Sequence, residues 1–302
     1  MKYDFTTLLN RKGHDALALD VLPIKDVEVD PNFSTIPMWV ADMNYPVFEN
    51  IQKQMIERIN EPHFGYFEMP EDYYKAIQFW QKETHGIDVE KEAIGYENGV
   101  LGILSSALQA FTSSGEAILV QSPCYIGFIH TLNNLGRKII DSPLKKEDNW
   151  AMDYEDIEKK IIKHNIHFAI FCSPHNPTGR VWKKEELKQL FEICRAHQVY
   201  IISDEIHQDL VFGENKHIPS LSTGEYDDIM VSIVAASKTF NIAGAQNSMV
   251  IIPDEKLQEK WDAYVKGNRV LGGNAFGYVA AQAAYTGGNE WLTLVLDQIE
   301  EN

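Results

Sequence analysis

The sequence predicts an α/β fold in which a mainly parallel sheet is sandwiched between helices. Two observations lead to this prediction. Short apolar runs rich in β-branched residues recur through the middle of the chain, at residues 117–120, 137–140, 168–172, 199–203 and 230–234. Segments with helical spacing of apolar residues separate them, such as 153–163 and 184–196. Strands that alternate with helices in this way are typical of crossover connections between parallel strands.

The length of 302 residues and the hydrophobic content of 44% allow one large domain with part of a second. We expect residues 1–45 to form an N-terminal arm and part of a small domain, and residues 46–274 to form the large domain. Residues 275–302 would begin the small domain, with two helical stretches that meet at Gly287 and Gly288. Because the second stretch stops without a cap, we expect this small domain to be truncated.

The overall composition excludes several classes of function. The formal charge of −17 would repel a phosphate backbone, so we expect no nucleic-acid partner. No apolar run approaches the roughly 20 residues of a spanning helix, and the first residues lack the pattern of a secretory signal. We therefore expect a cytoplasmic protein with no membrane partner. Cys124, Cys172 and Cys194 are odd in number and form no CxxC, which favours neither a disulfide framework nor a zinc site.

The residues after each strand carry the chemistry, because ligands of open α/β sheets bind outside the carboxyl ends of the strands. Lys238 follows the 230–234 run. A charged lysine at the mouth of a buried strand is costly, so the site either pairs it or lowers its pKa until it becomes a nucleophile of the Schiff-base type. Asp204 follows the 199–203 run and needs a cationic partner for the same reason.

Three further residues at strand ends are candidates with simpler alternatives. Tyr125 either offers an aromatic face at the rim of the sheet or only borders the core. Asn176 lies in a loop fixed by prolines and a glycine, which a turn role alone would also explain. His207 would lie on the face opposite Asp204 in a regular strand, so the two converge only if the chain turns after Asp204.

A candidate anion site lies at Gly99, Val100 and Leu101, where a helix-like segment begins. Backbone N–H groups at a helix start bind anions, although this sequence is neither a GxGxxG nor a Walker loop. A metal site built from the acids and histidine of residues 204–209 is disfavoured, because no pair has the i, i+4 spacing of helical ligands. We therefore expect no metal.

The strand ends and the anion site together supply an amine, an acid, an amide, an aromatic face and a phosphate cradle. Pyridoxal 5'-phosphate requires this set, since it carries an aldehyde, a ring nitrogen that must stay protonated, and a phosphate. The residues therefore indicate a pyridoxal-phosphate site.

The same motifs resemble a known family. The sequence is similar to the fold-type I pyridoxal-phosphate enzymes of the class I/II aminotransferase superfamily, and within it to the cystathionine β-lyase (MalY/PatB-like) branch. The resemblance is carried by Trp39–Met43, His63–Tyr66, residues 173–182, Ser203–His207 and residues 237–244. It covers essentially the whole chain and implies a pyridoxal-phosphate-binding large domain over residues 46–274.

The resemblance implies a role for each strand-end residue. Lys238 would bond covalently to the cofactor and later move the Cα proton of the substrate. Asp204 would keep the pyridine nitrogen protonated, and Tyr125 would stack on the ring. Asn176 and His207 would donate hydrogen bonds to the phenolic oxygen of the cofactor.

The resemblance also implies how the phosphate is bound. The backbone amides of Gly99, Val100 and Leu101 would hold it, together with the hydroxyl of Ser237. Tyr66 would reach the phosphate of the neighbouring subunit, which implies a homodimer with shared sites.

The activity implied is β-elimination from cystathionine or other cysteine S-conjugates, giving pyruvate, ammonia and a thiol. Three features depart from the family pattern. Ala235 and Gln246 stand where many relatives have a phosphate-binding serine and an arginine, and the chain ends at Asn302 before the arginine expected to bind the substrate carboxylate. A class I/II aminotransferase remains an alternative, as does a cofactor-binding or regulatory module with little turnover.

Overall fold

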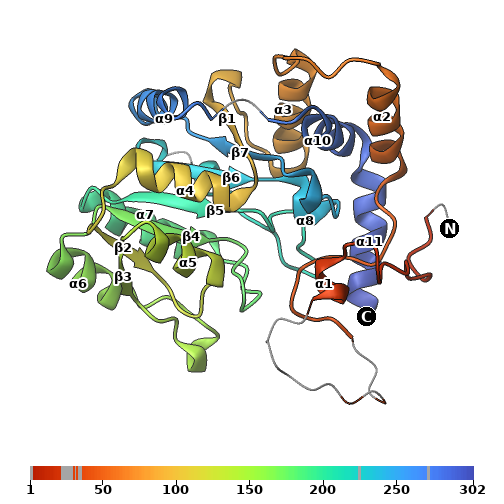
Figure 1. The fold of residues 1–302 in the computed structure, drawn as a ribbon. Helices are drawn as coiled ribbons and strands as arrows, with labels where there is room; N and C mark the ends of the chain where they lie inside the picture. The colour runs from red at the N-terminus through yellow and green to blue at the C-terminus, as the bar shows by residue number, and fades with distance from the viewer. Residues whose placement is uncertain (1–2, 22–29, 31, 33–35, 224–225, 271–272) are drawn as a thin grey trace.

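The computed structural model describes residues 3–21, 30, 32, 36–223, 226–270 and 273–302. Its centre is a seven-stranded sheet with the order β1-β7-β6-β5-β4-β2-β3 (Figure 1). The strands are β1 Ile94–Glu97, β2 Ala117–Val120, β3 Lys138–Asp141, β4 Phe168–Cys172, β5 Tyr200–Asp204, β6 Met230–Val234 and β7 Ser248–Ile251. Strands β2 to β6 are parallel, whereas β7 runs antiparallel to both β6 and β1. This confirms the predicted fold class.

Helices cover both faces of the sheet and form a further cluster beside it (Figure 1). One face is covered by α4 Val100–Phe111, α5 Ile126–Asn134 and α9 Glu255–Gly267, and the other by α6 Tyr154–His164 and α7 Lys184–Ala196. The remaining helices are α1 Leu17–Asp20, α2 Glu49–Asn60, α3 Glu71–His85, α8 Ala236–Thr239, α10 Ala275–Gly287 and α11 Asn289–Glu301. No described helix is long and apolar enough to cross a membrane.

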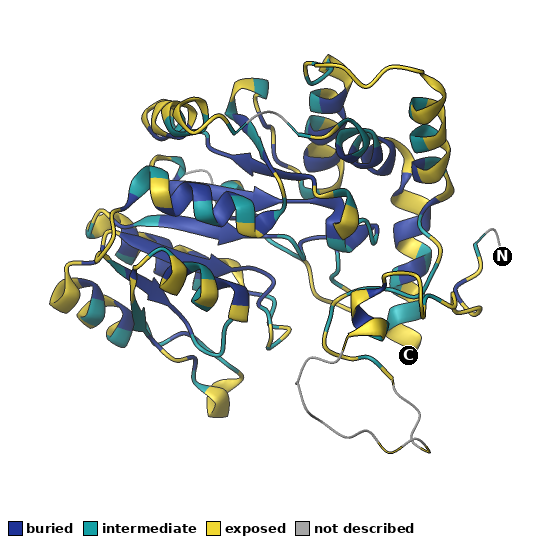
Figure 2. Ribbon diagram, viewed as in Figure 1, coloured by how far each residue is buried: buried dark blue, intermediate teal, exposed yellow. Residues whose placement is uncertain are grey.

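The alternation of side chains along the strands explains why both faces are covered. In β4, Phe168 and Ile170 pack on the α4 side, whereas Ala169 and Phe171 pack on the α7 side. All five residues of this strand are buried, as Figure 2 shows for the centre of the sheet. A strand buried on both faces must be apolar at every position, which is the pattern that the sequence presents.

The structure also contains two strands that the sequence did not predict. β1 and β7 have four residues each and form the antiparallel edge of the sheet. Within β1, Gly95 and Glu97 interrupt the apolar pattern. Such short strands are defined by pairing with neighbours rather than by intrinsic propensity.

A third apolar cluster joins the two ends of the chain to the sheet. Trp291 of α11 contacts Phe5 of the N-terminal arm and Phe240, with ring centroids 5.6 Å apart in both pairs. Phe240 also contacts Trp80 of α3 at 5.5 Å and Tyr285 of α10 at 6.4 Å. Since Phe240 directly follows α8, this cluster fixes the helix that carries Lys238.

A buried carboxylate connects α3 to α8. Asp209 accepts hydrogen bonds from Trp80 Nε1 at 3.0 Å and Thr239 Oγ1 at 2.6 Å, and its Oδ1 lies 2.7 Å from His85 Nε2. Its side chain is fully buried, and that of His85 is 5% exposed. Because Thr239 is the neighbour of Lys238, this network helps to orient the lysine helix.

We expect Asp209→Ala to lower the free energy of unfolding by about 3–5 kcal/mol, because it leaves three buried donors without their acceptor. Urea unfolding of the cofactor-free protein measures this value. Asp72→Ala is the control, since the Asp72 side chain is 74% exposed and its ion pair with Lys75 lies at the surface. Equal stability of the two variants would contradict the role given to Asp209.

Candidate active site

Four neighbouring strands end at the same edge of the sheet and bring four candidate residues together. In β4 and β5, Cys172 pairs with Asp204, and in β5 and β6, Asp204 pairs with Ile233. Strand β2 ends beside β4 in the same direction. Strand β5 lies between β4 and β6 (Figure 1), so Asp204 at its end lies between the start of the loop that carries Asn176 and the start of the helix that carries Lys238.

Lys238 is half-buried on α8, directly beyond the end of β6. Its Nζ donates a hydrogen bond to the carbonyl oxygen of Ala41 at 3.1 Å. Burial lowers the pKa of Lys238, and the negative charges of Asp42 and Asp204 oppose this shift. The direction of this shift agrees with the expectation that the site lowers the pKa of the lysine, and its role as a nucleophile stays a prediction.

Asp204 is the last residue of β5 and is 4% exposed. Burial raises its pKa to about 7, which the hydrogen bond from Ile206 N and the charge of Lys238 only partly oppose. Within the described part of the chain, this bond of 3.1 Å to Oδ1 is the one hydrogen bond that the Asp204 carboxylate accepts. The carboxylate is thus held in an apolar environment and faces a site where a cation would stabilise it.

His207 lies in a turn that begins just after Asp204, so the chain does turn where the sequence required it. Burial and the positive charge of Lys238 lower the pKa of His207 to about 4, which makes it a neutral imidazole at neutral pH. The backbone N–H of Asn176 donates to the Sγ of Cys172 at 3.4 Å, and its side chain is half-buried. His207 therefore offers a neutral side chain near Lys238.

The predicted anion site lies at the start of α4. Gly99 precedes the helix with a φ of 79°, in the region that favours glycine, and a Cβ there would meet open space. The side chains of Leu101 and Tyr125 both lie against Gly127. The start of α4 and the Tyr125 ring are thus close to each other, and Val100 is buried.

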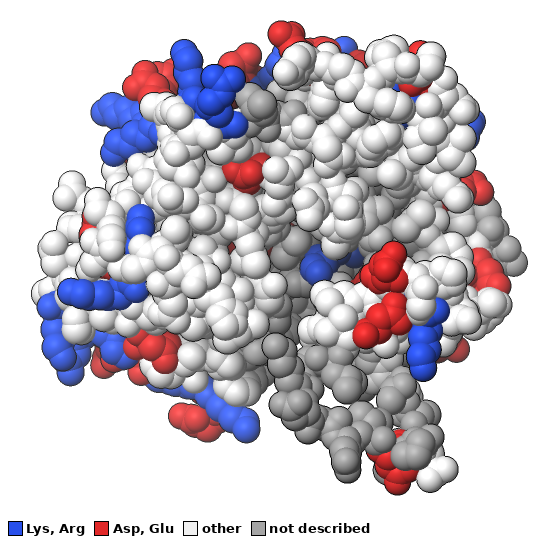
Figure 3. Space-filling model, in the orientation of Figure 1, with Lys and Arg blue, Asp and Glu red and all other residues white. Residues whose placement is uncertain are grey.

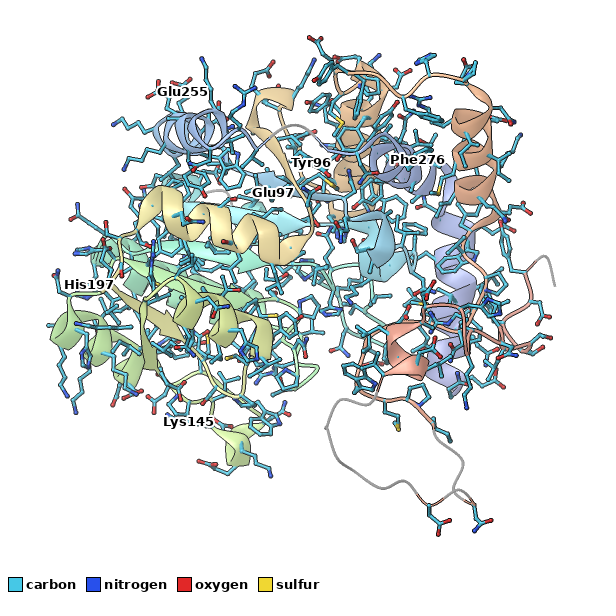
Figure 4. All side chains as sticks on the ribbon, viewed as in Figure 1. Tyr96, Glu97, Lys145, His197, Glu255 and Phe276 are labelled. Atoms are coloured by element: carbon cyan, nitrogen blue, oxygen red, sulfur yellow. The ribbon has the colours of Figure 1, made fainter. Side chains whose placement is uncertain are left out.

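Ser237, just beyond β6, and the end of β1 add polar groups at the same edge of the sheet. Ser237 is buried, and its hydroxyl donates to the carbonyl oxygen of Asn247 at 3.4 Å. The end of β1 contributes Tyr96 and Glu97 (Figure 4). Glu97 is also buried and accepts hydrogen bonds from Ser106 Oγ at 2.8 Å and from a backbone N–H at 2.9 Å.

The other acids of the 204–209 segment point to separate partners. Glu205 accepts hydrogen bonds from Ser232 Oγ at 2.9 Å and lies 2.8 Å from His217 Nε2, while Asp209 binds α3 and α8. Among the described residues, no group of three or more His, Cys, Asp or Glu side chains is arranged to hold a metal ion.

Tyr66 differs from the other candidates because its side chain is fully exposed.

On the face shown in Figure 3, the described Lys and Arg side chains lie mainly toward the margins, with few near the centre.

The residue pattern did not indicate the part that the N-terminal arm takes in the site. Ala41 and Asp42 belong to the Trp39–Met43 motif, yet nothing in their spacing indicated a contact with Lys238. Asn241 holds the same arm segment through two hydrogen bonds to Met43. The signal available in the sequence was the polar Asp42 and Asn44 in an otherwise apolar stretch.

Comparison with known proteins gives consistent results. Residues 37–279 match the family described as aminotransferase class I and II. The chain is 41% identical over 269 residues to the cystathionine beta-lyase PatB of Bacillus subtilis, covering 88% of this chain and 70% of that protein. It is 27% identical over 303 residues to the protein MalY of Escherichia coli, covering 99% of this chain and 76% of that protein.

Among solved structures, the chain is similar to cystalysin from Treponema denticola, which contains a pyridoxal 5'-phosphate cofactor. The TM-score is 0.94 at 31% sequence identity, over 100% of this chain and 77% of that one. The family match extends over most of the chain, and the fold agrees with it throughout. The chain belongs to the class I and II aminotransferase family.

Proposed function

We propose that this protein is a pyridoxal 5'-phosphate-dependent carbon–sulfur β-lyase that acts on cysteine S-conjugates such as cystathionine. The observation that carries the proposal is the placement of a buried carboxylate, Asp204 at the end of β5, and of Lys238, just beyond the neighbouring β6, at one edge of the sheet, close enough for each charge to act on the other. The identity of 41% to a named cystathionine beta-lyase favours this reaction over others of the family.

The residues present fit the cofactor. Asp204 is a buried carboxylate that accepts one hydrogen bond from the described residues, so it can pair with a protonated ring nitrogen. The start of α4 offers backbone N–H groups beside a glycine with open space, which suits a phosphate. The Tyr125 ring is 37% exposed and can cover an aromatic ring. Lys238 Nζ can bond to the aldehyde carbon.

When bound, the cofactor supplies an electron sink for the pair released as the substrate Cα loses its proton. Lys238 takes this proton at Nζ, because its lowered pKa leaves more of the amine unprotonated than in an exposed lysine. Asp204 would keep the ring nitrogen protonated, since an opposite charge stabilises a buried carboxylate. His207 is neutral and donates a hydrogen bond without adding charge. We propose that the Asn176 side chain donates a second hydrogen bond to the same cofactor oxygen, the phenolic oxygen.

The overall reaction breaks the Cβ–S bond of the substrate. The sulfur leaves with the bonding electrons and becomes a thiol on gaining a proton. The remaining aminoacrylate takes up one water and yields pyruvate and ammonia, so that the conjugate plus water balances the three products.

We also propose a homodimer in which Tyr66 reaches the phosphate of the partner site. The exposed Tyr66 side chain supports this, as do Phe64, Ile56 and Ile59, whose side chains are 63%, 50% and 54% exposed. The proposed cofactor domain, residues 46–274, contains every described strand. We place the protein in the cytoplasm, where its three free cysteines would stay reduced.

We expect Lys238→Ala to abolish the visible absorbance that covalent attachment of the cofactor produces, and to lower turnover by about 10²–10⁴-fold. Absorbance spectra before and after borohydride reduction measure the attachment. Mass spectrometry then locates the reduced adduct. A Lys238→Ala protein with an unchanged visible band would exclude the role assigned to this lysine.

We expect the wild-type protein to release pyruvate from cystathionine faster than it transfers an amino group to a keto acid. Both products can be measured in one reaction, by lactate dehydrogenase coupling and by amino-acid analysis. Amino transfer without pyruvate would favour an aminotransferase. Cofactor absorbance with neither product would favour a binding module.

We expect Asp204→Asn to change how the stability of the cofactor-free protein depends on pH. The folded-state pKa of Asp204 is about 7, above its ordinary 3.8, so between these values the folded state keeps a proton that the unfolded state has lost. The contribution of Asp204 to the free energy of unfolding of the wild-type protein therefore falls as pH rises from about 4 to about 7, by about 4 kcal/mol in total.

The Asp204→Asn protein has no ionisable group at this position, so this fall of stability with pH is absent. Its free energy of unfolding relative to wild type should therefore increase between pH 4 and pH 8. Its affinity for the cofactor should decrease. Urea unfolding at both pH values and cofactor titration test the two effects. Parallel stability profiles for the two proteins would refute the buried, protonated state of Asp204.

A further inference from the structure

The arm segment Ala41–Asn44 is fastened to the helix that carries Lys238. The Nζ of Lys238 donates to Ala41 O at 3.1 Å. Three residues after the lysine, Asn241 Nδ2 donates to Met43 O at 2.8 Å and Asn241 Oδ1 accepts from Met43 N at 3.0 Å. The two stretches lie almost 200 residues apart in sequence, at separations of 197 and 198. These three bonds therefore hold them together at the candidate site.

Asn241 makes these bonds from an unusual backbone conformation. Its φ is 56°, in the left-handed region that few residues other than glycine adopt. Asparagine tolerates this region better than most side chains, and its amide carries both a donor and an acceptor. It can thus satisfy the N–H and the C=O of Met43 at once, as a neighbouring strand would.

The arm segment is also held from its other side. Arg11 donates from Nε to Asn44 Oδ1 at 2.8 Å and from Nη1 to Asp42 Oδ2 at 2.8 Å. The backbone N–H of Leu9 donates to Asn44 O at 2.9 Å. With Asn241 on one side and Arg11 on the other, the Ala41 carbonyl has little freedom to move relative to α8.

The surroundings of the lysine amine give this carbonyl a chemical use. The charged groups that act on Lys238 are Asp42 from the arm and Asp204 from β5, and the neutral His207 faces it from the turn after β5. When Nζ takes a proton from carbon, one C–H bond breaks, one N–H bond forms and the amine becomes an ammonium. A carbonyl oxygen binds an ammonium more strongly than a neutral amine.

We propose that Asn241 is a positioning residue for proton transfer, which together with Arg11 holds the Ala41 carbonyl as the acceptor for the free amine of Lys238. A lysine side chain carries about 2 kcal/mol of rotamer entropy, and a fixed acceptor restricts the positions that a free Nζ visits. The inference rests on the proposed function for the step that it assists. The hydrogen bonds by which Asn241 and Arg11 hold the arm segment Ala41–Asn44, here called the clamp, are a property of the folded chain itself.

The test replaces Asn241 with glycine, because Asn241→Gly keeps the left-handed backbone accessible and removes only the amide. The matched control is Asn165→Gly. Asn165 has a φ of 48° at the end of α6, and its side chain contacts His167, away from the site. Any general cost of an asparagine-to-glycine change in this conformation appears in both variants.

Two readouts are measured on the full chain. Hydrogen exchange at the Met43 amide, with and without the cofactor, should be about five- to tenfold faster in Asn241→Gly than in wild type, and unchanged in the control. In the loaded enzyme, kcat should fall about 10- to 100-fold while KM and cofactor affinity stay within about twofold. The primary isotope effect of an α-deuterated substrate should increase, since proton transfer becomes the slow step.

A second variant, Arg11→Gln, releases the same segment from the opposite side and should shift both readouts in the same direction. Unchanged Met43 exchange in Asn241→Gly would overturn the clamp. Faster exchange with an unchanged isotope effect and kcat would overturn the positioning role and leave only a structural one. If the wild-type chain released no pyruvate, the proposed function would fail, yet the exchange data would still decide for or against the clamp.

Discussion

The structure depends on one electrostatic constraint, the burial of the Asp204 carboxylate opposite the amine of Lys238. Removal of this carboxyl group from water raises its pKa from 3.8 to about 7, a penalty of about 4 kcal/mol on the charged form. The same burial lowers the pKa of Lys238. Burial therefore disfavours the charged form of both groups. A cofactor with a protonated ring nitrogen and a reactive carbonyl would give Asp204 an opposite charge and Lys238 a covalent partner.

The scaffold makes this constraint specific by giving the neighbouring acids other partners. Glu205 is bound by Ser232 and lies against His217, and Asp209 is bound by α3 and α8. Within the described residues, Asp204 alone of these three acids has no side-chain hydrogen-bond partner. Of the three carboxylates in residues 204–209, only that of Asp204 is therefore available to the site. The carboxylates of Glu205 and Asp209 stabilise the elements around the site.

The lysine is positioned by contacts that come from both ends of the chain. Phe240 packs between α3, α10 and α11, and the arm segment Ala41–Asn44 lies on α8 through Asn241. The cofactor edge of the sheet is consequently completed by residues that precede the first strand and by helices that follow the last one. Changes in the arm are therefore expected to act on the chemistry as well as on stability.

The local residue pattern is enough to predict the central part of this fold. The runs at 117–120, 168–172 and 230–234 coincide with β2, β4 and β6, because strands buried on both faces must be continuously apolar, and the runs at 137–140 and 199–203 are shifted by one residue. The residues after these strands are the site candidates, since parallel strands end at one edge. Together with the family motifs, this was sufficient to name the cofactor and the reaction class.

The edge strands and the contacts between distant residues became known only from the three-dimensional structure. The edge strands β1 and β7 are stabilised mainly by pairing, which a local pattern with Gly95 and Glu97 does not encode. The contacts of Ala41 and Asn241, and the separate partners of Glu205 and Asp209, join residues far apart in sequence. Such contacts leave no periodic signal, because their geometry arises when whole elements pack together.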